Sequence, residues 1–318
     1  MTGRPNRVLK PRALHHGSRI ALFAPASPAE ALDWAVGKAE LVRMGFEVDL
    51  TQDFSPVGYF AGPLSERLKG FLTALEDSRV AALVSLRGGY GSSYLLSEHL
   101  QTKLGSLPEP KCVIGYSDLT SLQIFLWQMC GWVTFYGPMA AAGFARGAGD
   151  LKGFDEQSFH DATGNTKGNW SLNLKGETLH VGSAEGLLLG GCLTMIQTSL
   201  GTPWELDTED SILVLEDTSM KPYLVDRALM HLLQAGKFRG VRGLILGDFP
   251  GCEPPVAGGP TVREVCSRIL GPLGIPIVYG APVGHTNRSM LTLPLGIHTR
   301  LHGEGEGAIE FLEPAVVP

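Results

Sequence analysis

Three side chains that could carry out nucleophilic chemistry each stand at the end of an apolar stretch. Ser117 follows "CVIGY", Glu216 follows "ILVL", and His285 follows "IVYGAPVG". A hydroxyl, a carboxylate and an imidazole are the groups of a serine hydrolase, in which the imidazole takes the proton of the attacking hydroxyl and the carboxylate orients the imidazole. We therefore predict a nucleophilic serine with a base and an orienting acid.

A glycine-rich turn, "RGGYGSS", follows a further apolar run that ends at Leu86. Its backbone N–H groups could form an oxyanion hole, although glycines also serve simply to reverse the chain tightly. The turn begins like a dinucleotide-binding fingerprint, but Tyr94 stands where the third glycine belongs and no GK[ST] follows. No nucleotide cofactor is predicted.

Each candidate residue also has an ordinary structural interpretation. Ser117 or Asp118 could cap a helix, because Ser and Asp side chains accept hydrogen bonds from the unpaired N–H groups of a first turn. Glu216 and Asp217 could be surface acids paired with a nearby Lys or Arg. His285 could be a hydrogen-bonded structural histidine. The sequence motifs leave these alternatives open.

Two other kinds of catalytic site are disfavoured. Ser117 lacks the G-x-S-x-G signature of common esterases, because Leu119 takes the place of the last glycine. His298 and His302 stand four residues apart, but they lack the glutamate of HExxH and lie in an expected strand, so we interpret them as surface histidines. We predict no metal.

An α/β framework is needed to bring these residues together. Residues 1–150 alternate apolar runs with helical patterns, which predicts an open, doubly wound, mostly parallel sheet. Polar residues at the carboxyl ends of such strands face the usual ligand site. Residues 151–183 are predicted to be a linker, and residues 184–318 a smaller mixed α/β domain with antiparallel, barrel-like strands.

Composition excludes several kinds of protein. Hydrophobic residues make up 44% and charged residues 18% of the 318 residues, which is typical of a globular chain. The net charge of -6 and the scattered basic residues argue against nucleic acid and anionic membranes as partners. Five widely spaced cysteines and the absence of a signal-peptide pattern predict a soluble, cytoplasmic protein.

Taken together and in order, several motifs resemble the LD-carboxypeptidase family of serine peptidases, the muramoyltetrapeptide carboxypeptidases. The resemblance covers nearly the whole chain after residue 18. The motifs are "RGGYGSSYLL", "IGYSDLTSL", "YGPM", "EGLLLGGCLTMI", "GTPWELD", "LVLEDT", "YLVDRALMHL", "GLILGDF" and "GAPVGHT".

The resemblance implies a catalytic triad of Ser117, Glu216 and His285. It also implies an oxyanion hole made by the backbone N–H groups of Asp118 and of Gly89 in the glycine turn. No cofactor is implied, and relatives are commonly homodimers.

The implied substrate is a cytoplasmic murein peptide, cut before a terminal D-alanine in peptidoglycan recycling. An exopeptidase must recognise a free carboxylate, and Arg87 is the nearest cation to the expected oxyanion hole. We therefore expect Arg87 and Gly88 to bind substrate, with Tyr90 and Trp204 as further wall residues; alternatively, Arg87 pairs with an acid to hold the turn.

This chain departs from the family pattern at Cys192, where an asparagine is common after two glycines. A cysteine cannot replace the donors and acceptor of an amide. We do not expect Cys192 to be a nucleophile, because it lies in an apolar run interpreted as helical and has no adjacent histidine.

Two alternatives to the murein peptide carboxypeptidase remain. A branch of the family cuts the peptidyl-nucleotide antibiotic microcin C, but the stretch between Gly168 and Gly186 is short and holds one aromatic residue for stacking a base, Trp170. The other alternative is a non-catalytic protein that binds a cell-wall peptide, against which the presence of all three triad residues argues.

Overall fold

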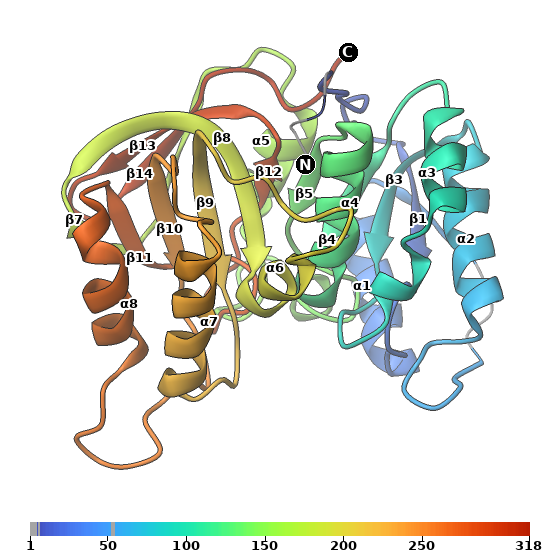
Figure 1. Cartoon of the computed structure of the whole chain (residues 1–318). Coiled ribbons are helices and arrows are strands. Elements are labelled where there is room, and N and C mark those ends of the chain that lie inside the picture. The colour runs from blue at the N-terminus through green and yellow to red at the C-terminus, as the bar shows by residue number, and fades with distance from the viewer. Residues whose placement is uncertain (1–4, 6, 52–54) are drawn as a thin grey trace.

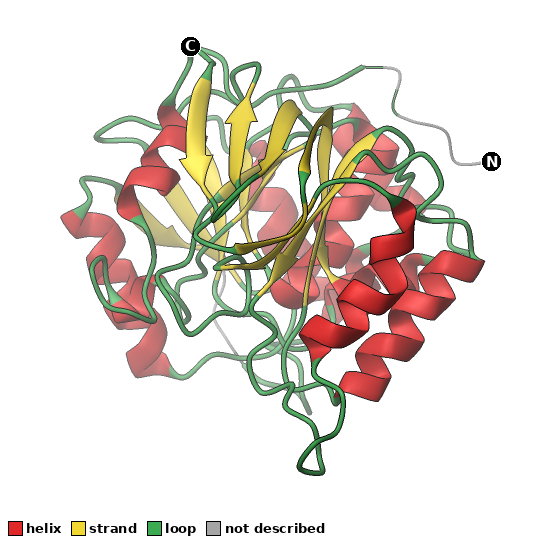
Figure 2. Cartoon of the chain, turned by 90° about the vertical axis from the view of Figure 1, so that its left-hand side faces the viewer, coloured by secondary structure: helices red, strands yellow, loops and turns green. Residues whose placement is uncertain are grey.

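Two β-sheets with helices on their outer faces make up the chain in the computed structural model, which describes residues 5, 7–51 and 55–318 (Figure 1). The N-terminal half forms five strands of a six-stranded sheet, whose sixth strand comes from near the C-terminus, and the rest of the chain forms an eight-stranded sheet. Figure 2 shows the strands in the centre and the helices around them. In the part of the chain that is described, no helix is long and apolar enough to cross a membrane.

The six-stranded sheet is parallel except for one edge strand. Its order is β12-β5-β4-β3-β1-β2, and β12 runs antiparallel to β5. Successive residues face opposite sides of the sheet: Ile20 and Leu22 join one buried cluster, and Ala21 and Phe23 another. The strands are β1 (Arg19–Phe23), β2 (Glu47–Leu50), β3 (Val80–Ser85), β4 (Cys112–Gly115), β5 (Thr134–Tyr136) and β12 (Leu293–Leu295).

Helices cover both faces of this sheet, which confirms the doubly wound fold. Helices α1 (Ala31–Arg43) and α5 (Glu156–Gly164) pack on one face, and α2 (Leu64–Glu76), α3 (Glu98–Gly105) and α4 (Thr120–Cys130) on the other. Ser97 caps α3 and Asp155 caps α5 through their side chains. Short 3-10 helices are η1 (Ser92–Leu95), η2 (Ser117–Leu119), η3 (Phe144–Arg146) and η4 (Gly271–Leu273).

The eight-stranded sheet is mixed and curls toward a barrel. Its order is β6-β14-β13-β8-β9-β10-β11-β7, with a parallel centre from β8 to β11. The backbone N–H groups of Leu174 and Thr178 bond to the carbonyls of Gly307 and Gly305, so both ends of the sheet meet the same turn. The strands are β6 (Trp170–Asn173), β7 (Glu177–His180), β8 (Gly182–Cys192), β9 (Ser211–Glu216), β10 (Gly243–Gly247), β11 (Ile277–Ala281), β13 (His298–Gly303) and β14 (Ala308–Phe311).

One helix joins the two sheets. The apolar residues of α4 point both into the core of the first sheet, through Leu122 and Leu126, and into that of the second, through Ile124 and Trp127. Helices α6 (Leu193–Ser199), α7 (Pro222–Gln234) and α8 (Val262–Leu270) cover the same face of the second sheet. A helix that is apolar on all sides is expected where it is buried on all sides.

Residues 151–183, expected to be an inter-domain linker, contain regular secondary structure. This segment holds α5, β6 and β7, and these two strands close opposite edges of the second sheet. In β6 polar residues alternate with apolar ones, because this edge strand faces solvent on one side. The run up to Cys192 was misread as helical, since it forms β8 and the helix begins at Leu193. The division into domains at residues 150 and 184 stays a prediction.

Candidate active site

Ser117 sits on the sharp turn between β4 and α4. Its φ is 65°, in the left-handed region that is uncommon for residues other than glycine. Neither Ser117 nor Asp118 caps a helix with its side chain, so the capping interpretation was wrong for both. A nucleophilic serine on a strained strand-to-helix turn presents its hydroxyl above the end of the sheet in other α/β enzymes.

Glu216 and His285 form a buried pair at the carboxyl end of the second sheet. Glu216 ends β9 and is fully buried, whereas the side chain of His285 is 20% exposed. His285 Nδ1 lies 2.8 Å from Glu216 Oε2, and the His285 backbone N–H donates to the same oxygen at 2.9 Å. This bond places the Nδ1 proton on the carboxylate side and leaves Nε2 for another partner.

The surroundings of His285 favour its charged form. Burial acts to lower the pKa of His285, but the charge of Glu216, their hydrogen bond and the charge of Asp217 together raise it above the ordinary value. Gly284 makes room for the pair, since a Cβ there would come within 2.4 Å of Glu216 Cδ. The pair therefore has the geometry of a base held by an acid.

Two tyrosines connect the serine turn with this pair. Tyr136, the last residue of β5, is fully buried and donates its hydroxyl to Glu216 Oε1. The backbone N–H of Ser117 lies 3.4 Å from the same hydroxyl oxygen. The ring of Tyr116 meets the ring of His285 edge-on, with 5.1 Å between centroids. The structure thus brings the surroundings of Ser117, Glu216 and His285 together, although no hydrogen bond joins Ser117 Oγ to His285 among the described residues.

The glycine turn lies directly against the serine. A Cβ on Gly88 would be 2.8 Å from Ser117 Cβ and 3.4 Å from the backbone nitrogen of Asp118. A Cβ on Gly89 would instead meet Ser27, 2.5 Å from its Oγ. The turn therefore packs against Ser117 through Gly88, where only a residue without a side chain fits.

The side chain of Asp118 holds the glycine turn in place. It is 3% exposed and accepts hydrogen bonds from the backbone N–H groups of Ser92, at 2.8 Å, and Gly91, at 3.3 Å. Burial raises the pKa of the Asp118 carboxyl, which these bonds and the charge of Arg67 partly offset. Asp118 thus positions the turn rather than capping the helix.

Arg67 supports the same turn from behind. It is 2% exposed and donates to the carbonyl oxygens of Pro25, at 2.5 Å, Gly62, at 3.1 Å, and Gly91, at 2.9 Å. Its guanidinium lies over the ring of Phe60, 4.6 Å from the centroid. A single buried cation therefore links three loops at this edge of the sheet.

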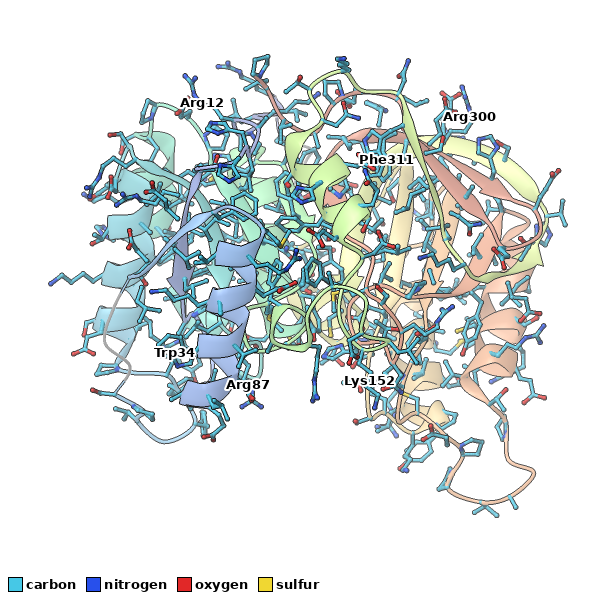
Figure 3. All side chains as sticks on the ribbon, turned by 180° about the vertical axis from the view of Figure 1, so that it is seen from behind. Arg12, Trp34, Arg87, Lys152, Arg300 and Phe311 are labelled. Carbon is cyan, nitrogen blue, oxygen red and sulfur yellow. The ribbon has the colours of Figure 1, made fainter. Side chains whose placement is uncertain are left out.

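The other residues predicted to bind substrate lie farther from the pair of Glu216 and His285. Arg87 is exposed, and its Nη1 donates to the carbonyl of Pro28 at 3.1 Å; among the described residues it forms no ion pair. Figure 3 shows Arg87 at the lower edge of the molecule, opposite Arg12 at the upper edge. Tyr90 is 46% exposed in an aromatic group with Tyr59, Phe60 and Tyr94. Trp204 packs against two apolar cores, and no interaction of the described residues connects it with Ser117.

Cys192 is buried beside the acids rather than exposed to a substrate. Its Sγ lies 3.6 Å from Asp217 Oδ2, and burial raises the pKa of the thiol well above its ordinary value, with the charges of Glu216 and Asp217 adding to this effect. Such a thiol stays protonated and is a poor nucleophile. His298 and His302 both lie in β13, in keeping with the expected strand.

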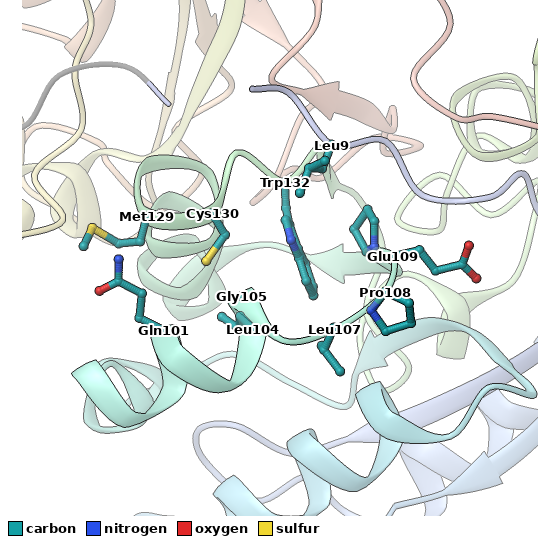
Figure 4. Close-up of a pocket in the computed structure, with 11 residues that line it drawn as sticks. Leu9, Gln101, Leu104, Gly105, Leu107, Pro108, Glu109, Met129, Cys130 and Trp132 are labelled. Carbon is teal, nitrogen blue, oxygen red and sulfur yellow. The ribbon is translucent and has the colours of Figure 1, made fainter. Parts of the chain in front are cut away.

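Neither a metal site nor the pocket beside Trp132 coincides with the candidate active site among the described residues. No group of three His, Cys, Asp or Glu side chains that could hold a metal ion occurs within residues 5, 7–51 and 55–318. A surface pocket lies between the end of α3 and Trp132, at the amino ends of the strands (Figure 4). Ser117 follows the carboxyl end of β4, so this pocket and the candidate site lie at opposite edges of the sheet.

Sequence reasoning missed Tyr136, Tyr116 and Arg67. Tyr136 ends an apolar run before "GPM", so the criterion that selected Ser117 and Glu216 could have found it. Tyr116 was treated as part of a strand. Arg67 lies within a helix, three positions after Leu64, and nothing in its neighbourhood indicates that this cation is buried.

Comparison with known proteins gives consistent matches. The LD-carboxypeptidase N-terminal domain matches residues 20–137, and the LD-carboxypeptidase C-terminal domain matches residues 185–301. A Bacillus subtilis protein named "Probable murein peptide carboxypeptidase" is 30% identical over 94% of this chain and 93% of its own length. The "Murein tetrapeptide carboxypeptidase" of Pseudomonas aeruginosa is 27% identical over 84% of this chain and 88% of its own.

Solved structures share the fold over almost the whole chain. The muramoyltetrapeptide carboxypeptidase from Oxalobacter formigenes has a TM-score of 0.81 and 29% identity, covering 93% of this chain and 99% of that one. The microcin C7 self immunity protein MccF, in complex with aspartyl sulfamoyl adenosine, has a TM-score of 0.87 and 23% identity, covering 97% of this chain and 99% of that one. At that identity the second match establishes a shared fold.

Proposed function

The chain belongs to the LD-carboxypeptidase family and is a carboxypeptidase, and we propose that it releases the terminal D-alanine of murein tetrapeptides through Ser117, His285 and Glu216. The observation that carries this proposal is the bond between His285 Nδ1 and the buried Glu216, beside a serine held at positive φ. This arrangement supplies a base with a fixed tautomer next to a presented hydroxyl.

The proposed reaction proceeds in two halves. Ser117 Oγ attacks the carbonyl carbon of the amide while His285 takes the hydroxyl proton, and the resulting oxyanion is held by backbone N–H groups of Asp118 and the Gly88–Gly89 turn. His285 then gives its proton to the nitrogen of the leaving D-alanine. A water molecule, deprotonated by His285, hydrolyses the acyl-enzyme and frees Ser117. Glu216 holds the imidazole and stabilises its positive charge throughout.

Arg87 is our proposed ligand for the free carboxylate of the substrate. It is exposed at the start of the glycine turn and has no acidic partner among the described residues, so its charge remains available to an anion. Arg87 directly precedes Gly88 in the chain, so we propose that it binds the substrate carboxylate beside the oxyanion donors. Tyr90 extends the same face and is our weaker candidate for a substrate wall.

The structure argues against the peptidyl-nucleotide alternative at one point. Trp170, the aromatic residue between Gly168 and Gly186, stacks on Phe311 with 4.0 Å between ring centroids. Phe311 lies in the upper part of the molecule in Figure 3, whereas Arg87 lies at the lower edge. Trp170 is therefore not placed to stack a base at the candidate site.

The deciding experiment measures release of D-alanine from L-Ala-D-Glu-meso-diaminopimelate-D-Ala by wild type and by Ser117→Ala. The all-L tetrapeptide and an aminoacyl sulfamoyl adenosine serve as alternative substrates. Release that requires the D-residue and is lost in Ser117→Ala supports the proposal. Cleavage of the adenosine compound alone points to the peptidyl-nucleotide activity, and folded wild type that cleaves neither points to a binding protein.

A further inference from the structure

The hydroxyl of Tyr136 is the meeting point of groups from both sheets. It donates to Glu216 Oε1, which belongs to β9, and the backbone N–H of Ser117 approaches its oxygen at 3.4 Å. The side chain of Thr120, in the first turn of α4, lies close enough to influence this hydroxyl. A phenol has one proton to donate, and here Glu216 accepts it.

We propose that Tyr136 is a positioning residue for the carboxypeptidase reaction. It holds Glu216 Oε1 so that Oε2 faces His285, and it links that carboxylate to the turn that carries Ser117. This role rests on the proposed function. Tyr136 does not reach the substrate, because its side chain is fully buried behind the serine turn. It acts through Glu216 and through the backbone of Ser117.

The two carboxylate oxygens of Glu216 have different hydrogen-bond partners, and this supports the role of Tyr136. Oε2 accepts two hydrogen bonds, from the ring and the backbone of His285, and Oε1 accepts that of Tyr136. A fully buried carboxylate needs hydrogen bonds to both oxygens to remain charged. Without the phenol, Oε1 loses this partner, and the carboxyl group is free to turn away from the imidazole.

The packing leaves the tyrosine in one position. A Cβ added to Gly191 would be 3.1 Å from Tyr136 Cε2 and 2.7 Å from Thr120 Cγ2, so β8 closes directly over the ring. Tyr116 lies against its other side, with 6.3 Å between centroids. A side chain enclosed in this way holds its hydroxyl in a fixed direction, which a positioning role requires.

Tyr136 remains protonated at neutral pH and is therefore a permanent donor. Burial raises the pKa of its hydroxyl well above the ordinary value, and the charge of Glu216 raises it further. Other ionisable groups whose pKa values feel the charge of Glu216 are His285, Tyr116, Cys192 and Cys252. Of these, histidine has the ordinary pKa nearest to neutral pH, so the titration of His285 can report on changes at Glu216.

The test compares Tyr136→Phe with Tyr279→Phe, which removes a phenol hydroxyl from β11, where Tyr279 stacks on Phe249. We measure kcat and KM for D-alanine release as a function of pH, and the titration of the His285 ring by ¹⁵N NMR, assigned with His285→Gln. For Tyr136→Phe we expect kcat to fall about 10- to 100-fold with KM unchanged. The acid limb of kcat/KM and the His285 titration should both move to lower pH, because a carboxylate that turns away from the ring stabilises the imidazolium less.

Several results overturn the role. The role is refuted if Tyr136→Phe keeps the full kcat and the His285 titration does not move. It is also refuted if kcat falls only in proportion to the fraction of the variant that is folded. Tyr279→Phe should match wild type in both measurements. If wild type releases no D-alanine, the proposed function fails, and the His285 titration still decides the role of Tyr136. Should Tyr136→Phe not fold, Thr120→Val, which weakens the phenol as a donor, is expected to shift the titration in the same direction by less; no shift refutes the role.

Discussion

Ser92 and Asp118 are joined by reciprocal hydrogen bonds. The backbone N–H of Ser92 donates to the Asp118 carboxylate at 2.8 Å, and the Ser92 hydroxyl donates to the backbone carbonyl of Asp118 at 2.5 Å. Both residues are buried. Side chains therefore fix the glycine turn to the serine turn, in addition to the pairing of their strands in the sheet. We expect this to hold the proposed oxyanion donors of the two turns at a constant distance from each other.

Asp118→Asn should lower kcat about 10-fold with a small effect on KM, because an amide can accept from one of the two N–H groups but opposes the other. The free energy of unfolding should fall by about 1–3 kcal/mol. Asp155→Asn is the matched control, since Asp155 accepts a backbone N–H at 2.8 Å at the start of α5. The control should leave kcat unchanged. Equal kcat values in both variants would remove Asp118 from the positioning of the turn.

Gly88→Ala should reduce kcat about 10²- to 10³-fold, because the added methyl would stand 2.9 Å from Ser117 Oγ and must displace the turn that supplies the oxyanion donor. Gly105→Ala, at the end of α3, is the control. Nothing lies within 4 Å of a Cβ there, so it should be stable and fully active. The kcat of both variants is measured by steady-state kinetics. A Gly88→Ala enzyme with the kcat of wild type would contradict the proposed oxyanion hole.

The pH dependence of kcat/KM should reflect the raised pKa of His285. The base must be neutral to accept the serine proton, so activity should rise with pH through an apparent pKa above about 6.5, the ordinary value. Glu216→Gln removes the negative charge that raises this pKa, so the acid limb should move to lower pH. The limiting kcat should fall on the order of 10⁴-fold.

The raised pKa of His285 also predicts how the stability of the fold changes with pH. Because the folded pKa of His285 is raised above its unfolded value, the stabilisation from its pairing with Glu216 is fully present below about pH 6.5 and is lost as the pH rises through the folded pKa. Urea unfolding at a series of pH values should show this decline in wild type and not in His285→Gln. The opposite slope would mean that His285 is buried in its neutral form.

Arg67→Met should lower the free energy of unfolding by about 2–5 kcal/mol, because it removes a charged donor from the carbonyl oxygens of Pro25, Gly62 and Gly91. Arg79→Met is the control, since Arg79 lies on the surface and pairs with Asp77 through an exposed side chain. That change should stay within about 1 kcal/mol of wild type. Urea denaturation measures both, and similar values would show that the buried guanidinium contributes no more than a surface one.

The sequence predicted those features that are carried by local patterns. The apolar runs before Ser117 and Glu216 marked β4 and β9, and the helical spacing from Tyr223 onward marked α7. The doubly wound first sheet followed from the alternation of such runs. Local patterns also indicated which side chains stand at the carboxyl ends of the strands, where the structure brings Glu216 and His285 into contact.

The features that could not be predicted from the sequence depend on contacts between segments that are far apart in the chain. The end of β8 was interpreted as helical, and the pattern around Gly190 and Gly191 does not show that both lie against other segments. A Cβ on Gly190 would be 2.0 Å from the carbonyl oxygen of Val214, and one on Gly191 would be 2.7 Å from Thr120 Cγ2. Arg67 is buried because three loops happen to present carbonyls to it. Tyr136 acquires its partners from β9 and α4, which no pattern around residue 136 reveals.

The short strand β12 has a consequence for how the halves of the chain can be separated. His285 lies in a connection that leaves the second sheet after β11 and enters the first sheet at β12, where Leu293 pairs with Tyr136. The histidine loop is thus anchored in both sheets, and the sheets cannot part widely unless this pairing breaks. A fragment cut between the two matched regions would leave β5 as a bare apolar edge, which is a template for aggregation. We therefore expect the two halves to depend on each other for folding, and each half produced alone from a gene split at residue 150 to aggregate.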